Sequence, residues 1–194
     1  TLTKKTLDHG YEPKSLIKNI WKGINAMVAN DGKYTNEEVF WSVLSKEYGE
    51  GVYKDKQLFN NYYENEFNDV KSCCKPNHKA KQVIELCKQK GYIIILATNP
   101  IFPKIATDKR INWSGLNTND FDYYTTYENS YHSKPNLEYY NEILTKFDLT
   151  PNECVMIGNN VDEDMVATSF HNGTKTFYNR SIAHQSLGFD KYSF

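Results

Sequence analysis

The sequence predicts an α/β fold, a parallel sheet with helices on both faces, preceded by a bundle of helices. Continuous apolar runs at residues 92–97 and 154–157 suit strands buried on both faces. Helical patterns separate these runs, as parallel strands require. The first 70 residues show helical periodicity alone. We therefore expect a helical domain at 1–73 and an α/β domain at 74–194.

The composition gives no sign of nucleic-acid binding or of a membrane environment. The chain has 194 residues and a formal net charge of −1, a balance that does not favour nucleic acid or an anionic membrane surface as a partner. No apolar run approaches the roughly 20 residues of a membrane span. Cys73, Cys74, Cys87 and Cys154 form no C-x-x-C pair, which favours reduced thiols in the cytoplasm. The oligomeric state cannot be read.

Helical periodicity defines the elements of the first region. Residues 14–29 form one helix, whose expected buried stripe is Leu16, Ile20, Ile24 and Val28, with Ile17 and Trp21 beside it. Thr35 opens a second helix, because Glu38 three residues later completes a capping box. Its expected buried face is Val39, Phe40, Val43 and Leu44. A third helix is expected over residues 56–70.

Helix and strand then alternate. A helix over 78–90 should bury Val83, Ile84 and Cys87 and end at Gly91, a residue that suits helix C-termini. The further elements expected in chain order are a strand at 92–97, a short helix at 104–110, a strand at 123–126, a helix at 136–147, a capped turn at 150–153, a strand at 154–157, a helix at 162–170 and a strand at 176–178.

Polar residues gather where these strands end. They are Thr98-Asn99, Ser133-Lys134-Pro135 and the stretch from Gly158 to Asp164. The carboxyl ends of parallel strands meet along one sheet edge, so the three groups should converge. A hydroxyl, amides, a cation and carboxylates are the equipment of phosphoryl transfer. Each group alone has another explanation: a strand that ends on polar residues, a solvated turn, or acidic residues favouring a helix dipole.

These groups resemble the motifs of the haloacid dehalogenase superfamily of phosphohydrolases. Leu96-Ala97-Thr98-Asn99 resembles its second motif, Ser133-Lys134-Pro135-Asn136 its third, and Gly158-Asn159-Asn160 with Glu163-Asp164 its fourth. The helical first region resembles the cap that many members insert after their first strand. The resemblance implies a Rossmann-like core with a helical cap.

The resemblance also implies a mechanism. An Asp nucleophile would form an aspartyl-phosphate on a small phosphorylated substrate, while a second Asp, two residues on, would act as acid and base. Thr98 and the backbone at Asn99 would hold the phosphoryl group, and Lys134 would steady its charge. Asn160 would ligate Mg²⁺, and Asp164 would orient the metal's water shell.

Two features depart from the family pattern. The first motif, an apolar strand ending in Asp-x-Asp, is missing, since Asp8 follows no such strand and Asp120-Phe121-Asp122 comes after the second motif. We therefore expect the nucleophile strand upstream of residue 1, and strands 93–97 and 154–157 separated by one vacant position. Asn160 also stands where the family has a metal-binding Asp, so Mg²⁺ should bind more weakly.

Three functions remain open at this point. The leading hypothesis is a magnesium-dependent phosphohydrolase whose nucleophile lies outside these residues. The alternative is an inactive relative that binds a phosphorylated ligand or a protein partner. A dehalogenase is a third reading, which the acidic fourth motif disfavours. Fold alone would not decide among them.

Overall fold

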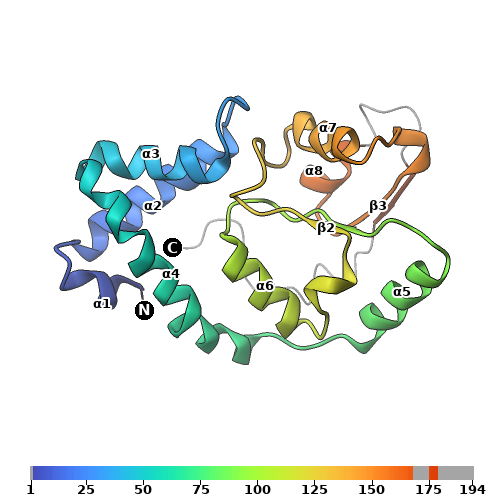
Figure 1. Cartoon of the computed structure of the whole chain (residues 1–194), viewed down its shortest axis with the longest axis horizontal. Helices are drawn as coiled ribbons and strands as arrows, with labels where there is room; N and C mark the ends of the chain where they lie inside the picture. Colours follow the sequence, from blue (N-terminus) through green and yellow to red (C-terminus); the bar gives the residue numbers. More distant parts are fainter. Residues whose placement is uncertain (1, 168–174, 179–194) are drawn as a thin grey trace.

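The structure is a computed structural model that describes residues 2–167 and 175–178. It shows two regions side by side, one of helices and one in which helices surround short strands (Figure 1). We call residues 2–73 the helical region, and residues 78–167 with 175–178 the α/β region. None of the helices in these described ranges is both long and apolar enough to cross a membrane.

The two longest helices of the helical region begin at residues whose side chains cap them. Its elements are α1 (Leu2–Leu7), α2 (Pro13–Val28), α3 (Asn36–Tyr48), the 3₁₀ turn η1 (Glu50–Asp55), α4 (Lys56–Glu64) and the 3₁₀ turn η2 (Glu66–Cys73). The capping box of Thr35 and Glu38 at α3 is confirmed. The helix expected over 56–70 is instead divided at Asn65, where η2 follows α4.

The buried face of α2 differs from the expected stripe. Its buried residues are Leu16, Asn19, Gly23 and Met27, whereas Ile17, Trp21 and Val28 are exposed. Gly23 explains the difference, because a Cβ there would lie 2.6 Å from the Phe40 ring. The missing side chain lets α3 approach the α2 backbone, and this contact selects the buried face. On α3 the buried residues are Asn36, Phe40, Trp41 and Leu44.

The α/β region follows the expected order of elements. They are α5 (His78–Gln89), β1 (Ile95–Leu96), α6 (Lys104–Trp113), the 3₁₀ turn η3 (Thr118–Asp120), β2 (Tyr123–Tyr124), α7 (Leu137–Lys146), the 3₁₀ turn η4 (Pro151–Glu153), β3 (Val155–Gly158), α8 (Val161–Asp164) and β4 (Lys175–Tyr178). Gly91 lies just past α5 with φ +74°. The expected end of the helix at 162–170 lies partly outside the described residues.

The described strands form two small parallel ladders. In one, Ile95 of β1 lies opposite Tyr123 of β2; in the other, Val155 of β3 lies opposite Lys175 of β4. β1 and β3 are not paired with each other. The vacant strand position expected between them stays a prediction, and the described sheet is much smaller than that of a full Rossmann-like core.

The expectation that both apolar runs are buried on two faces is wrong for the described chain. Val155 and Ile157 of β3 are 55% and 63% exposed, and Ile93 before β1 is 49% exposed. No residue of α5 is buried either, and Val83 is about half exposed. Burial of such runs requires a neighbouring strand or layer, which the described residues do not supply on these sides.

Apolar packing joins the two regions. One core cluster contains Phe40, Trp41 and Phe59 of the helical region together with Tyr127, which follows β2. A second cluster combines Phe67 of η2 with residues of α6. The loops that follow β1 and β2 are therefore held directly against the helices, and these loops lead to the candidate site.

Candidate active site

Thr98 lies two residues after β1, and its backbone is fixed by two hydroxyl groups. The Thr98 carbonyl oxygen accepts hydrogen bonds from Thr125 Oγ1 at 2.8 Å and from the Tyr139 hydroxyl at 2.7 Å. Burial holds the pKa of the Tyr139 hydroxyl well above its usual value, so the group stays a neutral donor. The ends of β1 and β2 are thus tied to α7 at Thr98.

Lys134 and Asp164 form a buried ion pair. Lys134 Nζ donates to Asp164 Oδ1 at 2.6 Å, and both residues are about 95% buried, each with 5% relative exposure. Lys134 comes from the loop before α7, and Asp164 is the last residue of α8. The Tyr139 ring lies beneath the ammonium, with 5.7 Å from Nζ to the ring centroid. Tyr139 therefore contacts both Lys134 and Thr98.

The second Asp164 oxygen organises the loop after β3. Oδ2 accepts the backbone N–H groups of Asn159 and Asn160, each at 3.0 Å. Gly158 permits this arrangement, because a Cβ on it would lie 2.3 Å from Asp164 Oδ2. The carboxylate thus joins the end of β3 to Lys134, and Gly158 leaves the space that it needs.

Two predicted polar residues do not join this cluster through their side chains. Asn160 Oδ1 accepts the N–H of Asp162 at 3.1 Å and so caps α8. Asn99 Oδ1 is buried and accepts a hydrogen bond from none of the described residues. A buried acceptor without a donor is costly, so this atom marks a position suited to a ligand or a further chain segment.

The described donors fit a metal ion only in part. No group of three or more His, Cys, Asp or Glu residues in this part of the chain lies close enough to hold one. Both Asp164 oxygens already accept hydrogen bonds, and Asn160 Oδ1 caps a helix. A complete Mg²⁺ shell would therefore need oxygen ligands from elsewhere.

Comparison with protein families shows the family to which this chain belongs. A family model described as haloacid dehalogenase-like hydrolase matches residues 13–169. This match covers most of the chain, including Thr98, Lys134 and Asp164. The chain belongs to the haloacid dehalogenase-like hydrolases. No curated protein gives a significant match.

Sequence reasoning missed a residue of this hydrolase that joins its two regions, Asn36. Its side chain is fully buried, and its Nδ2 donates to the Pro100 carbonyl and to Ser133 Oγ, both at 3.1 Å. Its backbone N–H donates to the Ser130 carbonyl at 2.9 Å. Asn36 thus connects the start of α3 to the loops that carry Thr98 and Lys134. No motif marks it, since it follows an N-cap where many residues are tolerated.

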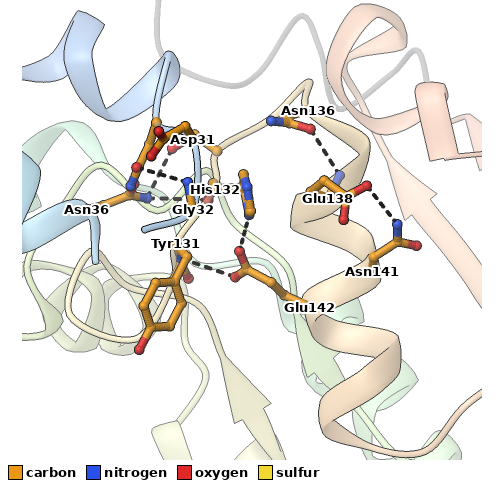
Figure 2. Close-up of polar contacts among 12 residues, drawn as sticks. Asp31, Gly32, Asn36, Tyr131, His132, Asn136, Glu138, Asn141 and Glu142 are labelled. Carbon is orange, nitrogen blue, oxygen red and sulfur yellow. Dashed lines mark hydrogen bonds and ion pairs between the residues drawn. The ribbon is translucent and has the colours of Figure 1, made fainter. Parts of the chain in front are cut away.

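The turn between α2 and α3 packs on the loop that carries Lys134. Figure 2 shows His132 between the turn at Gly32 and Glu142 of α7, to which its Nδ1 is hydrogen-bonded. Gly32 has φ +84°, and a Cβ on it would lie 2.4 Å from the His132 ring. His132 therefore holds the loop that carries Lys134 between the α2–α3 turn and α7.

The Asp-x-Asp spacing at residues 120–122 of this hydrolase has a structural explanation. Asp120 accepts hydrogen bonds from Lys81 at 2.8 Å and from Lys88 at 3.2 Å. Asp122 accepts the backbone N–H of Ile94 at 2.7 Å. Both carboxylates therefore hold α5 and the start of β1 in place, which agrees with their exclusion as the nucleophile motif.

Proposed function

We propose that this chain forms part of a phosphohydrolase that cleaves small phosphate monoesters through an aspartyl-phosphate. The observation that carries the proposal is the buried Lys134–Asp164 pair, which Tyr139 connects to Thr98. An ammonium group has three N–H donors, and Asp164 takes one of them. The others can bind a phosphoryl oxygen and the attacking carboxylate, where positive charge stabilises the transition state.

The chemistry divides between residues of this chain and a nucleophile beyond it. A carboxylate attacks phosphorus, the ester oxygen leaves as it is protonated, and water then hydrolyses the aspartyl-phosphate. Lys134 offsets the phosphoryl charge, while the backbone N–H at Asn99 binds a phosphoryl oxygen. The Thr98 hydroxyl donates to the Thr125 carbonyl at 3.3 Å and would turn from it to a second phosphoryl oxygen when substrate binds. Asp164 keeps Lys134 and the loop after β3 in position. We further propose that residues 1–73 act as a cap that selects the substrate.

The nucleophile in this proposal lies on a further strand between β1 and β3. The two ladders are separate, and Val155 and Ile157 are more than half exposed. An inserted strand would pair the free edges and cover these side chains. Strands lie about 4.8 Å apart, so one strand would separate β1 from β3 by roughly 9 to 10 Å.

Mg²⁺ is the cofactor proposed for this site. Asn160 and Asp164 would contribute to its surroundings, and the inserted strand would supply the remaining ligands. When bound, the ion supplies positive charge to the phosphoryl oxygens. The four cysteines form no disulfide, which suits a reducing cytoplasm.

The test is a panel of phosphate monoesters assayed with the full-length protein, with Mg²⁺ and with EDTA. Hydrolysis of at least one ester that stops with EDTA supports the proposal. A full-length protein that hydrolyses no member of the panel would contradict it.

Failure in that assay would favour the second candidate, an inactive relative that binds a phosphorylated ligand. The specific observation behind it is that Asn160 brings no charge and that Asp164 is already paired with Lys134. Isothermal titration with inorganic phosphate would separate the two functions, since the inactive relative binds phosphate without hydrolysing any ester.

A further inference from the structure

The peptide unit that joins Thr98 to Asn99 has different surroundings at its two polar ends. At one end, the Thr98 carbonyl oxygen accepts hydrogen bonds from the hydroxyl groups of Thr125 at 2.8 Å and of Tyr139 at 2.7 Å. At the other end, no residue in the described part of the chain accepts a hydrogen bond from the Asn99 N–H. The described residues therefore fix the carbonyl and leave the N–H for a ligand.

The geometry of the peptide unit couples these two ends. The bond between Thr98 and Asn99 is trans, and a planar trans peptide directs its C=O and its N–H to opposite sides. Two hydroxyl groups that fix the direction of the carbonyl therefore also fix the direction of the Asn99 N–H. Hydrogen bonds in a chain also strengthen one another, by about 10–30% per bond. A hydroxyl that donates to the carbonyl thus makes the N–H of the same unit a stronger donor.

The two hydroxyl groups are buried, and they support each other. Tyr139 and Thr125 are 0% and 1% exposed, and their hydroxyl oxygens lie 3.0 Å apart. Either hydroxyl can donate to the other, and the Thr98 carbonyl keeps at least one donor in each arrangement. One donor is enough to satisfy a buried carbonyl. The second donor therefore contributes to the direction and the polarity of the peptide unit.

The ring of Tyr139 connects this peptide unit to Lys134. Lys134 Nζ lies 5.7 Å from the ring centroid, and attraction between the ammonium and the ring favours this position. The hydroxyl and the ring of one buried side chain thus act on two groups that are proposed to bind phosphoryl oxygens. Phe in place of Tyr139 would keep the ring and lose the hydroxyl, so the two effects can be separated.

We infer that Tyr139 and Thr125 are positioning residues that direct and polarise the Asn99 N–H as a donor to a phosphoryl oxygen. This inference rests on the proposed phosphohydrolase function and adds the two hydroxyl groups that preorganise this donor. A preorganised donor needs no reorientation when charge arrives, and it is worth more in a site that excludes water than in solution. Both residues act through the Thr98 carbonyl and not by contact with the substrate.

The Asn99 amide reports on this effect apart from catalysis. Full-length protein labelled with ¹⁵N is titrated with inorganic phosphate, and the Asn99 amide signal is followed by NMR. Phosphate should move the Asn99 proton downfield in the parent protein. Tyr139→Phe should move it upfield before phosphate is added and weaken phosphate binding about threefold. The matched control is Tyr123→Phe, which loses a hydroxyl that donates to the Asn129 carbonyl at 3.1 Å, and it should behave like the parent protein.

Substitutions at Thr125 separate the hydroxyl from packing. Thr125→Val removes the hydroxyl and keeps the volume, so it should weaken phosphate binding about threefold. Thr125→Ser keeps the hydroxyl and removes a methyl group, so it should bind phosphate more tightly than Thr125→Val. A role in packing alone predicts the reverse order, because Ser leaves a gap in the core and Val does not. Loss of both hydroxyl groups, in Tyr139→Phe with Thr125→Val, should weaken binding about tenfold.

Kinetics distinguish this inference from the proposed function. In an active protein, Tyr139→Phe and Thr125→Val should each lower kcat/KM for the best phosphate ester about threefold, and Tyr123→Phe should leave it unchanged. Parental phosphate affinity and a parental Asn99 signal in both hydroxyl-free variants would overturn the inference and leave the phosphohydrolase standing. A parent protein whose Asn99 signal does not respond to phosphate would also overturn it. Phosphate binding that weakens as expected, in a protein that hydrolyses no ester, would support the inference and refute the phosphohydrolase.

Discussion

Asn36→Asp is the substitution that most sharply tests how the two regions are joined. The change preserves the shape of the side chain and removes the NH₂ group. In the parent protein this group donates to the Pro100 carbonyl and to Ser133 Oγ, and it lies 3.3 Å from the His132 carbonyl. One oxygen of a carboxylate at this position would keep the hydrogen bond from Asn30 Nδ2. The other would face the Pro100 and His132 carbonyl oxygens and could donate to neither while ionised.

The magnitude follows from burial. Asn36 has 0% relative exposure, so the Pro100 carbonyl would be left without its donor away from water. An unsatisfied buried polar group costs about 1–3 kcal/mol, and an unpaired buried charge adds to this. We expect the free energy of unfolding to fall by about 3–5 kcal/mol at pH 7.

The loss should depend on pH in a defined direction. Burial among acceptors raises the pKa of the new carboxyl group above its value in the unfolded chain. A raised folded pKa means that the loss of stability relative to the parent protein is smallest at low pH and grows as pH rises through that pKa.

Urea unfolding of full-length protein at pH 7 measures this effect. The control is Asn25→Asp on α2, where the side chain is exposed and the change should stay within about 0.5 kcal/mol. Equal, small losses in both variants would refute the view that Asn36 connects α3 to the two loops.

Three further predictions concern single sites. Gly158→Ala should displace Asp164 and lower both stability and turnover, because the new Cβ would lie 2.3 Å from Oδ2. Parental values in urea unfolding and in phosphatase assays would contradict this. The Lys81 ammonium is the main cause that lowers the pKa of Asp120 from 3.8 to about 2. The contribution of Asp120 to stability is therefore present above pH ~4 and is lost as pH falls towards 2. In Asp120→Asn, the free energy of unfolding in urea should change less between about pH 5 and pH 2 than in the parent protein, and an unchanged slope would count against this. Asn160→Asp should lower the Mg²⁺ concentration for half-maximal activity, because a charged oxygen binds the ion more strongly, and a titration with equal or weaker dependence on Mg²⁺ would refute it.

Local hydrogen bonding made several elements predictable. The capping boxes at Thr35 and Thr150 involve residues three apart, so the sequence alone indicates where α3 and η4 begin. The sequence predicted that the polar groups after the parallel strands converge at one sheet edge, and the structure brings Lys134 and Asp164 of two of these groups together.

Burial was less predictable, since it depends on what packs against each element. Periodicity could not show that Gly23 admits the Phe40 ring, and this contact decides which face of α2 is buried. Likewise, the apolar character of Val155 and Ile157 indicates strands that need neighbours on both sides. The described chain leaves these side chains largely exposed, and the sequence of the strand alone does not show what covers them.

Residues that position others were also missed. Tyr139 lies beneath Lys134 and bonds to Thr98, but its helical spacing indicated no more than a place on α7. Asn36 bonds to loops that are 64 and 97 residues away in the sequence. Such long-range polar contacts leave no local pattern, so they became visible once the fold was known.

The central claim is that Lys134 acts on a phosphoryl group, and one measurement tests it most directly. Turnover of full-length protein on its best phosphate ester is compared for the parent, Lys134→Ala and the control Lys146→Ala. Lys146 lies in the last turn of α7, and its ammonium lies 4.9 Å from the Tyr123 ring centroid. We predict a loss of at least ~100-fold in Lys134→Ala, the scale of one lost electrostatic stabiliser, and parental turnover in Lys146→Ala. Unchanged turnover in a folded Lys134→Ala protein would contradict the account.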